Sequence, residues 1–246
     1  MLRIATWNLD RPTKRHSRHS GELLQHIKNI NADVWVLTET DSSICPGIDY
    51  QSVCSAERET FANVTETWVT IWSRLPLTPV GDVWDNQFAC CGKIATTTGE
   101  LILYGMVLPW LGCEEYLPNR GTEAFLHALE NQREDWRRLR NLHGNCGICV
   151  AGDFNQDLGS KHYYGSNVGK QSLRNTLKQE GMTCLTAGRY DKVAAATNAR
   201  RACIDHIVIS NDWLSRFRGS VQAWPSEQVI DSGLTDHFGM YVDLEI

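Results

Sequence analysis

Five groups of polar side chains stand beside apolar segments of the sequence, spread over most of its length. Carboxylate and amide oxygens suit Mg²⁺, which keeps water and substrate phosphate oxygens as its remaining ligands. An imidazole beside such oxygens adds a group that can carry a proton near neutral pH. Together these side chains offer the chemistry of metal-assisted work on a phosphate. They are Asn8, Glu39, Asp153 with Asn155, Asp205 with His206, and Asp236 with His237.

Each of these side chains, taken alone, also has an ordinary structural explanation. Asn8 is a residue type common at the turn that ends a strand, and a lone Glu39 is most often an exposed loop residue. Asp205 and His237 are equally typical of hydrogen-bonded core residues, and His206 is assigned to that structural role. A buried carboxylate nevertheless needs a partner for its charge, and an ordinary neutral core does not require such a pair.

Well-known motifs for calcium binding, nucleotide binding and hydrolysis do not fit this chain. The segment from Asp153 to Gly159 imitates the start of an EF-hand calcium loop. Its sixth position, which requires glycine, is Leu158, and its twelfth, which requires glutamate, is Tyr164. These two mismatches argue against calcium binding of that type. No P-loop, GxSxG or HExxH motif occurs in the sequence.

Apolar runs of β type predict the strands that would position these groups. Polar groups follow or adjoin several of these runs, and loops at strand ends are where a rigid sheet commonly holds catalytic side chains. The segment TTTGEL around Gly99 predicts a tight turn between two neighbouring strands. The runs begin at Leu2, Val34, Thr67, Leu101, Ile148, Cys203 and Met240.

Three further segments carry apolar residues at helical spacing. The first runs from Leu23 to Ile30 with Ser20 as its expected cap, and the second from Phe125 to Leu139. A shorter helix around Leu173 and Leu177 is expected to end at Gly181. Because strands outnumber helices without a regular βαβ alternation, stacked sheets covered by helices are favoured over a doubly wound sheet.

Length and composition set the remaining limits. The chain has 246 residues, 42% of them hydrophobic, and a net charge of −5, which is typical of a globular protein and excludes a histone-like basic coat. Without a repeat or linker, residues 1–246 are interpreted as one domain. The apolar stretch 101–111 is far shorter than the about 20 residues of a membrane span, and no secretory signal is recognised.

Nine cysteines, an odd number, predict reduced thiols in a cytoplasmic protein. Cys146 and Cys149 form the one CxxC motif. Because no second pair stands at zinc-finger spacing, buried and inert thiols are favoured over a zinc site.

The motifs ATWNL, LTET, AGDFN, CIDHIVIS and LTDHFG, in this order, resemble the endonuclease/exonuclease/phosphatase superfamily, which includes DNase I and exonuclease III. The resemblance extends from Thr6 to His237. It implies a DNase I-like α/β fold, a four-layer α/β/β/α sandwich of two mostly antiparallel sheets covered by helices. It also implies that residues 1–246 are a nearly bare catalytic domain that cleaves phosphoesters with Mg²⁺ or Mn²⁺.

The resemblance implies a role for each polar group. Glu39 would be the main metal ligand, assisted by Asn8 and Asp236. Such a cation would stabilise the negative charge that in-line attack concentrates on the phosphate oxygens.

The catalytic roles follow from the same resemblance. Asp153 would orient or deprotonate the attacking water, and Asn155 would hold a phosphate oxygen. His237 would contact the scissile phosphate, with Asp205 fixing its imidazole. Many members place an Asn-x-His, or a Tyr followed shortly by Pro-Asn, at the end of a central strand, and this chain has neither there. Tyr104 is left as a candidate phenol for the phosphate, with a half-buried strand aromatic as the alternative.

A basic loop follows Asn8 in this otherwise acidic chain. If Asn8 lies at the metal, the loop lies at the rim of the site and could grip additional phosphates. A solvated loop leading into the first helix is the equal alternative. A second candidate rim is the segment 161–164, whose tyrosines could stack on bases or be ordinary loop aromatics. The proposed substrate-binding residues of the basic loop are Arg11, Lys14, Arg15 and Arg18.

These features favour a divalent-metal-dependent phosphoesterase, and the basic loop favours a nuclease acting on nucleic acid. A phosphatase or phosphodiesterase for a small molecule or lipid headgroup is the alternative, allowed by the short chain and the absence of an obvious DNA-intercalating insertion. A non-catalytic binding protein of the same fold is disfavoured, because all of the catalytic residue types are retained together. No obligate protein partner is implied.

Overall fold

Two six-stranded sheets form the centre of the computed structural model, which describes residues 1–12, 17–56, 65–81, 83–114 and 118–246. Strands β1 and β2 are parallel, as are β7 and β8, and the other neighbouring pairs are antiparallel. The first sheet has the order β11 (Phe217–Trp224), β12 (Gly239–Leu244), β1 (Leu2–Asn8), β2 (Val34–Asp41), β4 (Glu66–Ser73) and β3 (Gln51–Cys54). The second has the order β5 (Leu77–Pro79), β6 (Ala89–Thr96), β7 (Gly99–Val107), β8 (Gly147–Asp153), β10 (Asp205–Ser210) and β9 (Met182–Cys184).

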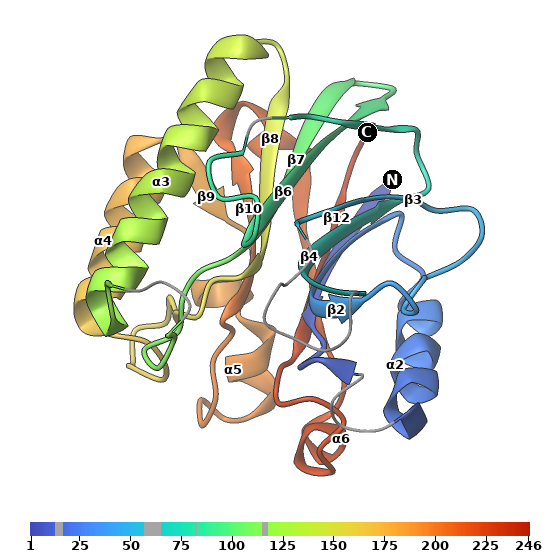
Figure 1. Cartoon of the computed structure of the whole chain (residues 1–246), viewed down its shortest axis with the longest axis vertical. Coiled ribbons are helices and arrows are strands. Elements are labelled where there is room, and N and C mark those ends of the chain that lie inside the picture. The colour runs from blue at the N-terminus through green and yellow to red at the C-terminus, as the bar shows by residue number, and fades with distance from the viewer. Residues whose placement is uncertain (13–16, 57–64, 82, 115–117) are drawn as a thin grey trace.

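Helices cover the outer faces of both sheets, so the expected four-layer sandwich of mostly antiparallel sheets is confirmed. Helices α3 and α4 lie on one side of the stacked sheets and α2 on the other, while α5 and α6 lie at one end (Figure 1). The helices are α2 (Ser17–Ile30), α3 (Gly121–Leu142), α4 (Asn167–Gln179), α5 (Lys192–Ala196) and α6 (Glu227–Asp231), with 3₁₀ turns η1 (Gly188–Tyr190) and η2 (Asn211–Arg216).

Three apolar clusters hold these layers together. One lies between the sheets, another between the second sheet and α3 and α4, and the last between the first sheet and α2. Gly105 shows how closely the sheets approach, because a Cβ atom there would lie 2.7 Å from Cγ1 of Val69 on β4. The alternation of the strands therefore places apolar side chains on both faces of each sheet.

The helical stripes of the sequence correspond to α2, α3 and α4, and Gly181 follows the end of α4 with a positive φ of 59°. The expected start of the first helix at Ser20 is wrong, because α2 already begins at Ser17. No helix breaker stands between these two positions, so the helix extends by almost a turn. All nine cysteines are free thiols. None of the helices in the described ranges has the length and apolar character needed to cross a membrane.

A candidate active site at one end of the sandwich

The polar groups of five distant segments meet at the end of the sandwich where α5 and α6 lie (Figure 1). Because β1 and β2 are parallel, Asn8 and Glu39 reach the same edge of the first sheet. In the second sheet Asp153 ends β8 directly opposite Asp205, the first residue of β10. His237 stands just before β12, the other neighbour of β1.

The amide of Asn8 bridges the two sheets. Its Nδ2 donates to Oε1 of Glu39 at 3.2 Å and to Oδ2 of Asp153 at 2.9 Å. Its Oδ1 accepts the backbone N–H of Asp10 at 2.9 Å, which keeps the NH₂ group turned toward the two carboxylates. Asn8 is therefore the residue that brings Glu39 of one sheet and Asp153 of the other to a common point.

The end of β8 and the turn that follows it present Asp153. Gly152 has a φ of 140°, and a Cβ atom there would lie 1.9 Å from the carbonyl oxygen of Met106, so only glycine fits. Asn155, with a φ of 46°, donates its backbone N–H to Oδ1 of Asp153 at 2.8 Å and its Nδ2 to Oδ2 at 2.9 Å. The same Nδ2 donates to the carbonyl oxygen of Leu108 at 2.9 Å. Asn155 thus orients Asp153, and its contact with a phosphate stays a prediction.

Asp205 and His237 form a close pair. Nδ1 of His237 donates to Oδ2 of Asp205 at 2.6 Å, and this carboxylate is buried. The indole of Trp7 donates to the carbonyl oxygen of His237 at 3.0 Å, so the backbone of the histidine is held as well. The imidazole side chain keeps 12% of its surface exposed, and Nε2 lies 3.6 Å from Oδ1 of the exposed Asp236. Nε2 is therefore the nitrogen available to a substrate.

Burial and crowding of negative charge shift the pKa values of this group. Burial and the neighbouring Asp205 raise the pKa of Asp153 to about 8, although the positive charge of His237 opposes the shift. Burial likewise raises the pKa of Asp205, against the effect of His237. For His237 burial acts to lower the pKa, but the charges of Asp205 and Asp153 outweigh it and hold the pKa well above its usual range. The positive charge near Asp153 and Asp205 is therefore too small to stabilise both carboxylates fully in their ionised form.

The oxygens at this point fit a divalent cation of the Mg²⁺ or Mn²⁺ type. Glu39 and Asp153 supply hard carboxylate oxygens, whereas Asn8 presents its NH₂ group here, so its role as a metal ligand stays a prediction that requires the amide to turn its Oδ1 inward. Oδ1 of Asp205 is buried and has no hydrogen-bond partner among the described residues, so an acceptor is left for a further donor or ion. Donor atoms of Asp153, Asp205 and His237 all lie within 4.8 Å of one another, but a cation between the last two would have to displace their hydrogen bond.

Tyr104 requires a correction. The side chain is fully buried, and its hydroxyl donates to Oδ2 of Asp135 on α3 at 2.8 Å. It lies on the face of β7 that packs against the helices, where Trp136 contacts its ring edge-on. Burial and then the nearby Asp135 raise the phenol pKa well above its usual value. The phenol is therefore a core group and does not reach the candidate active site.

The basic loop is described only in part. The backbone N–H of Arg11 donates to the carbonyl oxygen of Glu39 at 2.9 Å, and its guanidinium lies 3.8 Å from the buried Glu66. Arg11 thus stands beside the site with a carboxylate already near its charge. Lys14 and Arg15 lie outside the described residues, as does the side chain of Arg18 on α2. Their binding of phosphates stays a prediction, and so does the metal role of Asp236.

A buried ion pair below the site was missed from the sequence, where Asp157 was considered only as part of a calcium loop. Lys170 on α4 donates from Nζ to Oδ1 of Asp157 at 2.6 Å. Oδ2 accepts the backbone N–H groups of Tyr163 and Tyr164 at 3.0 and 3.1 Å. A lysine 13 residues after an aspartate is no recognisable signal, because only the packing of α4 against the loop joins them.

His206 has the structural role assigned to it. The side chain is fully buried, and Nε2 donates to the carbonyl oxygen of Gln156 at 3.1 Å. Nδ1 then accepts the hydroxyl of Thr186 at 3.0 Å. Burial lowers the pKa of His206 to about 4, so the imidazole is neutral at physiological pH.

Replacement of Lys170 by methionine is expected to destabilise the protein by about 3 kcal/mol, because it leaves the buried charge of Asp157 without its ionic partner. The measurement is urea unfolding followed by circular dichroism. Lys178→Met, an exposed change on the same helix, is the matched control and should cost less than about 0.5 kcal/mol. Equal stabilities of the two variants would contradict the role given to this ion pair.

Comparisons with known proteins agree with this fold. The model of the endonuclease/exonuclease/phosphatase family matches residues 5–237. The fold is similar to the endonuclease domain of TRAS1, a telomere-specific non-LTR retrotransposon, with a TM-score of 0.67 at 17% identity, covering 99% of this chain and 98% of that one. It is also similar to a 3′-5′ exonuclease (NExo) from Neisseria meningitidis, with a TM-score of 0.64 at 16% identity and all of both chains covered. None of the curated proteins has a significantly similar sequence.

Proposed function

Because this chain belongs to the endonuclease/exonuclease/phosphatase family, we propose that it is a divalent-metal-dependent hydrolase of phosphodiester bonds and that its substrate is nucleic acid. The activities that name the family all break phosphoester bonds. The observation that carries the proposal is the meeting of Asp153 with the Asp205–His237 pair and with Glu39 at one point between the sheets.

In this proposal the cation is held by Glu39 and by Oδ1 of Asn8, whose amide turns over when the cation binds, with Asp236 as an additional ligand. A divalent cation at this position supplies positive charge beside the phosphate oxygens on which negative charge develops. The carboxylates of Glu39 and Asp153 meet at the Asn8 amide, so they present their oxygens to the same space.

Asp153 is the proposed group that orients the attacking water and accepts its proton. The pKa of about 8 means that this carboxyl takes up a proton more readily than an ordinary aspartate. Its two oxygens are held by three hydrogen bonds from Asn8 and Asn155, which restrict the direction from which water can approach. Asp153 thus has both the basicity and the fixed position that the role requires.

His237 is the proposed contact to the scissile phosphate. Asp205 binds Nδ1 and favours the protonated ring, so Nε2 carries a proton that it can donate to a phosphate oxygen. The oxygens of an attacked phosphodiester gain negative charge in the transition state, and this hydrogen bond then strengthens.

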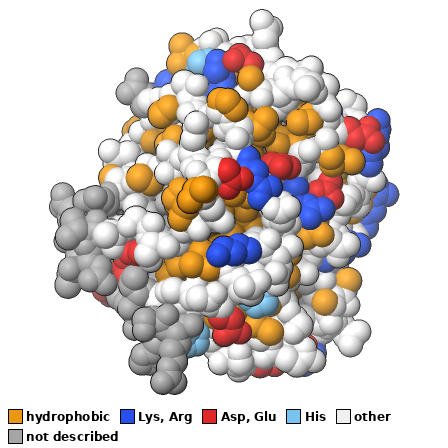
Figure 2. Space-filling view, turned by 90° about the vertical axis from the view of Figure 1, so that its right-hand side faces the viewer, with side chains coloured by type: hydrophobic (Ala, Val, Ile, Leu, Met, Phe, Trp, Pro, Cys, Tyr) orange, Lys and Arg blue, Asp and Glu red, His pale blue; other side chains and the backbone are white. Residues whose placement is uncertain are grey.

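Two observations support nucleic acid as the substrate. The two solved structures compared above are named as nucleases, an endonuclease domain and an exonuclease. Positive charge in the sequence is also concentrated after Asn8, between Arg11 and Arg18. The face shown in Figure 2, by contrast, has Lys and Arg side chains mixed with Asp and Glu. Elsewhere in the first sheet and its flanking loops, Arg3 pairs with Asp243, and Arg74 pairs with Asp33 and Asp49.

The test is a substrate screen with the purified protein. Plasmid DNA, single-stranded DNA, RNA, bis(p-nitrophenyl) phosphate and phosphomonoesters are each incubated with Mg²⁺, with Mn²⁺ and with EDTA. We expect cleavage of nucleic acid with either cation, loss of cleavage in EDTA, and recovery when excess cation is added. Turnover that survives chelation would contradict the metal role. Hydrolysis of phosphomonoesters alone would identify a phosphatase instead.

A further inference from the structure

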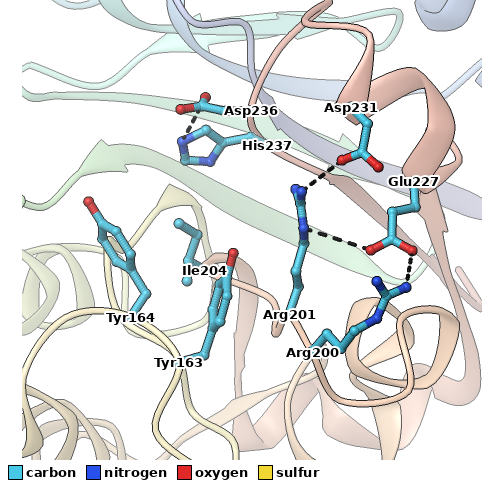
Figure 3. Close-up of a pocket in the computed structure, with 9 residues that line it drawn as sticks. All are labelled: Tyr163, Tyr164, Arg200, Arg201, Ile204, Glu227, Asp231, Asp236 and His237. Carbon is cyan, nitrogen blue, oxygen red and sulfur yellow. Dashed lines mark hydrogen bonds and ion pairs between the residues drawn. The ribbon is translucent and has the colours of Figure 1, made fainter.

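A pocket of about 520 Å³ opens next to the catalytic histidine, and the proposed function leaves it unexplained. Its volume lies within the range of clefts that bind small organic groups. The walls come from the loop after β8, the loop after α5, helix α6 and the segment before β12 (Figure 3). His237 and Asp236 lie at one end of it, so anything bound there is a neighbour of the attacked phosphate.

Two tyrosines form an aromatic wall of this pocket. Tyr163 and Tyr164 are 40% and 36% exposed, and both hydroxyl ends point toward the side where His237 lies (Figure 3). The ring centroids are 6.5 Å apart and the planes meet at 44°, so the rings do not stack on each other. Burial and then the charges of Asp153, Asp236 and Glu39 raise the pKa of Tyr164, as expected for a phenol beside the catalytic carboxylates.

The backbone beneath these rings is held in place. Asp157 accepts the N–H groups of both tyrosines, and the Lys170 ion pair fixes that carboxylate. Gln156 adds a further hydrogen bond to this backbone, because its Nε2 donates to the carbonyl oxygen of Tyr164 at 2.9 Å. A ring on a fixed backbone loses little further freedom when a flat group stacks on it, which is the property of a preformed binding surface.

The charges of the opposite wall argue against a second phosphate as the occupant. Arg200 pairs with Glu227 at 2.6 Å, and Arg201 pairs with Asp231 at 2.9 Å. With Asp236 and the protonated His237 included, the pocket holds three carboxylates against two guanidinium groups and one imidazolium, so it has no net positive charge. A doubly charged phosphate finds no uncompensated guanidinium in this wall, whereas a neutral ring with N–H and C=O edges finds both donors and acceptors.

We propose that this pocket binds an unpaired nucleobase of the nucleotide next to the scissile phosphate, with Tyr163 and Tyr164 as the stacking residues and Arg201 at its polar edge. The inference rests on the proposed function and makes it more specific. A base inside a duplex is already stacked and paired, so it enters a pocket only after leaving the helix. Single-stranded or locally unpaired nucleic acid is therefore the substrate class that fits this site.

Binding is tested first, in EDTA, so that turnover does not enter the measurement. Single-stranded oligonucleotides carrying one 2-aminopurine are titrated with protein, and the fluorescence of that base reports stacking. We expect Tyr163→Ala and Tyr164→Ala to weaken binding about 10-fold each, while the phenylalanine variants, which keep the ring, bind as the wild type does. Trp84→Ala removes an exposed aromatic ring outside the pocket and is the matched control.

Cleavage then separates this inference from the proposed function. Oligonucleotides with Mn²⁺ are compared with the same strands carrying abasic tetrahydrofuran units around the cleaved bond. The ratio of kcat/KM between base-bearing and base-free strands should fall about 10-fold or more in the alanine variants. An unchanged ratio would overturn the nucleobase pocket even if the enzyme cleaves both strands. A wild-type protein that hydrolyses no phosphodiester would overturn the proposed function itself.

Discussion

Replacement of His237 by alanine is expected to lower kcat for phosphodiester hydrolysis by about a hundredfold or more while the fold stays intact. The variant loses the proton on Nε2 that is available to the phosphate, and Asp205 loses the partner of its 2.6 Å hydrogen bond. The measurement is steady-state kinetics on single-stranded DNA, with circular dichroism to confirm folding. His127→Ala, on the outer face of α3, is the matched control and should keep normal rates. A normal kcat for His237→Ala would mean that the catalytic group lies elsewhere.

The pH dependence gives this prediction a second measurement. In the proposed mechanism His237 acts in its protonated form, so the rate should fall as pH rises through its pKa. Asp205 raises that pKa by its charge and its hydrogen bond. Asp205→Asn removes the charge, and the alkaline limb of the rate profile should therefore move to lower pH. A limb that stays in place would show that another group controls it.

Replacement of Asp153 by asparagine is expected to lower kcat by at least about a hundredfold, because an amide cannot accept the proton of the attacking water. Oδ2 of Asp153 also accepts hydrogen bonds from the side-chain NH₂ groups of Asn8 and Asn155. An asparagine NH₂ at that position cannot accept them, so both hydrogen bonds would be lost. Asn175→Ala, an exposed change on α4, serves as the control for handling and folding. Comparable rates for the wild type and Asp153→Asn would contradict the role of this carboxylate.

Asp153→Asn is also expected to raise the stability of the folded protein relative to the wild type as the pH increases. The folded protein holds the Asp153 pKa at about 8, above the value of an unfolded aspartate, so the folded state binds the proton more tightly. That contribution is complete below pH about 4 and is lost as pH rises through about 8. In EDTA the Tm of Asp153→Asn relative to the wild type should therefore increase between pH 5 and pH 9. A constant difference would show that Asp153 does not carry the raised pKa.

Much of the fold and part of the site could be predicted from local patterns. A run such as 34–38 is apolar enough to require a buried strand, and the stripe from Phe125 to Leu139 fits only one face of a helix. Asn8 and Asp153 were located because each stands at the end of such a strand, and Asp205 because it is a carboxylate within one. Periodicity and turn residues act over a few positions, so a single segment carries them completely.

Three features were decided only by the tertiary structure. Tyr104 stands on a strand with both faces buried, and alternation does not say which face meets the second sheet and which meets α3. The Asp157–Lys170 pair and the pocket beside His237 join segments whose contact depends on how α4, α5 and α6 pack against the ends of the sheets. The sequence thus determined the strands, the helices and the types of reactive group. The packing of the layers determined which groups meet, because burial, charge and distance between remote segments exist only once the chain is folded.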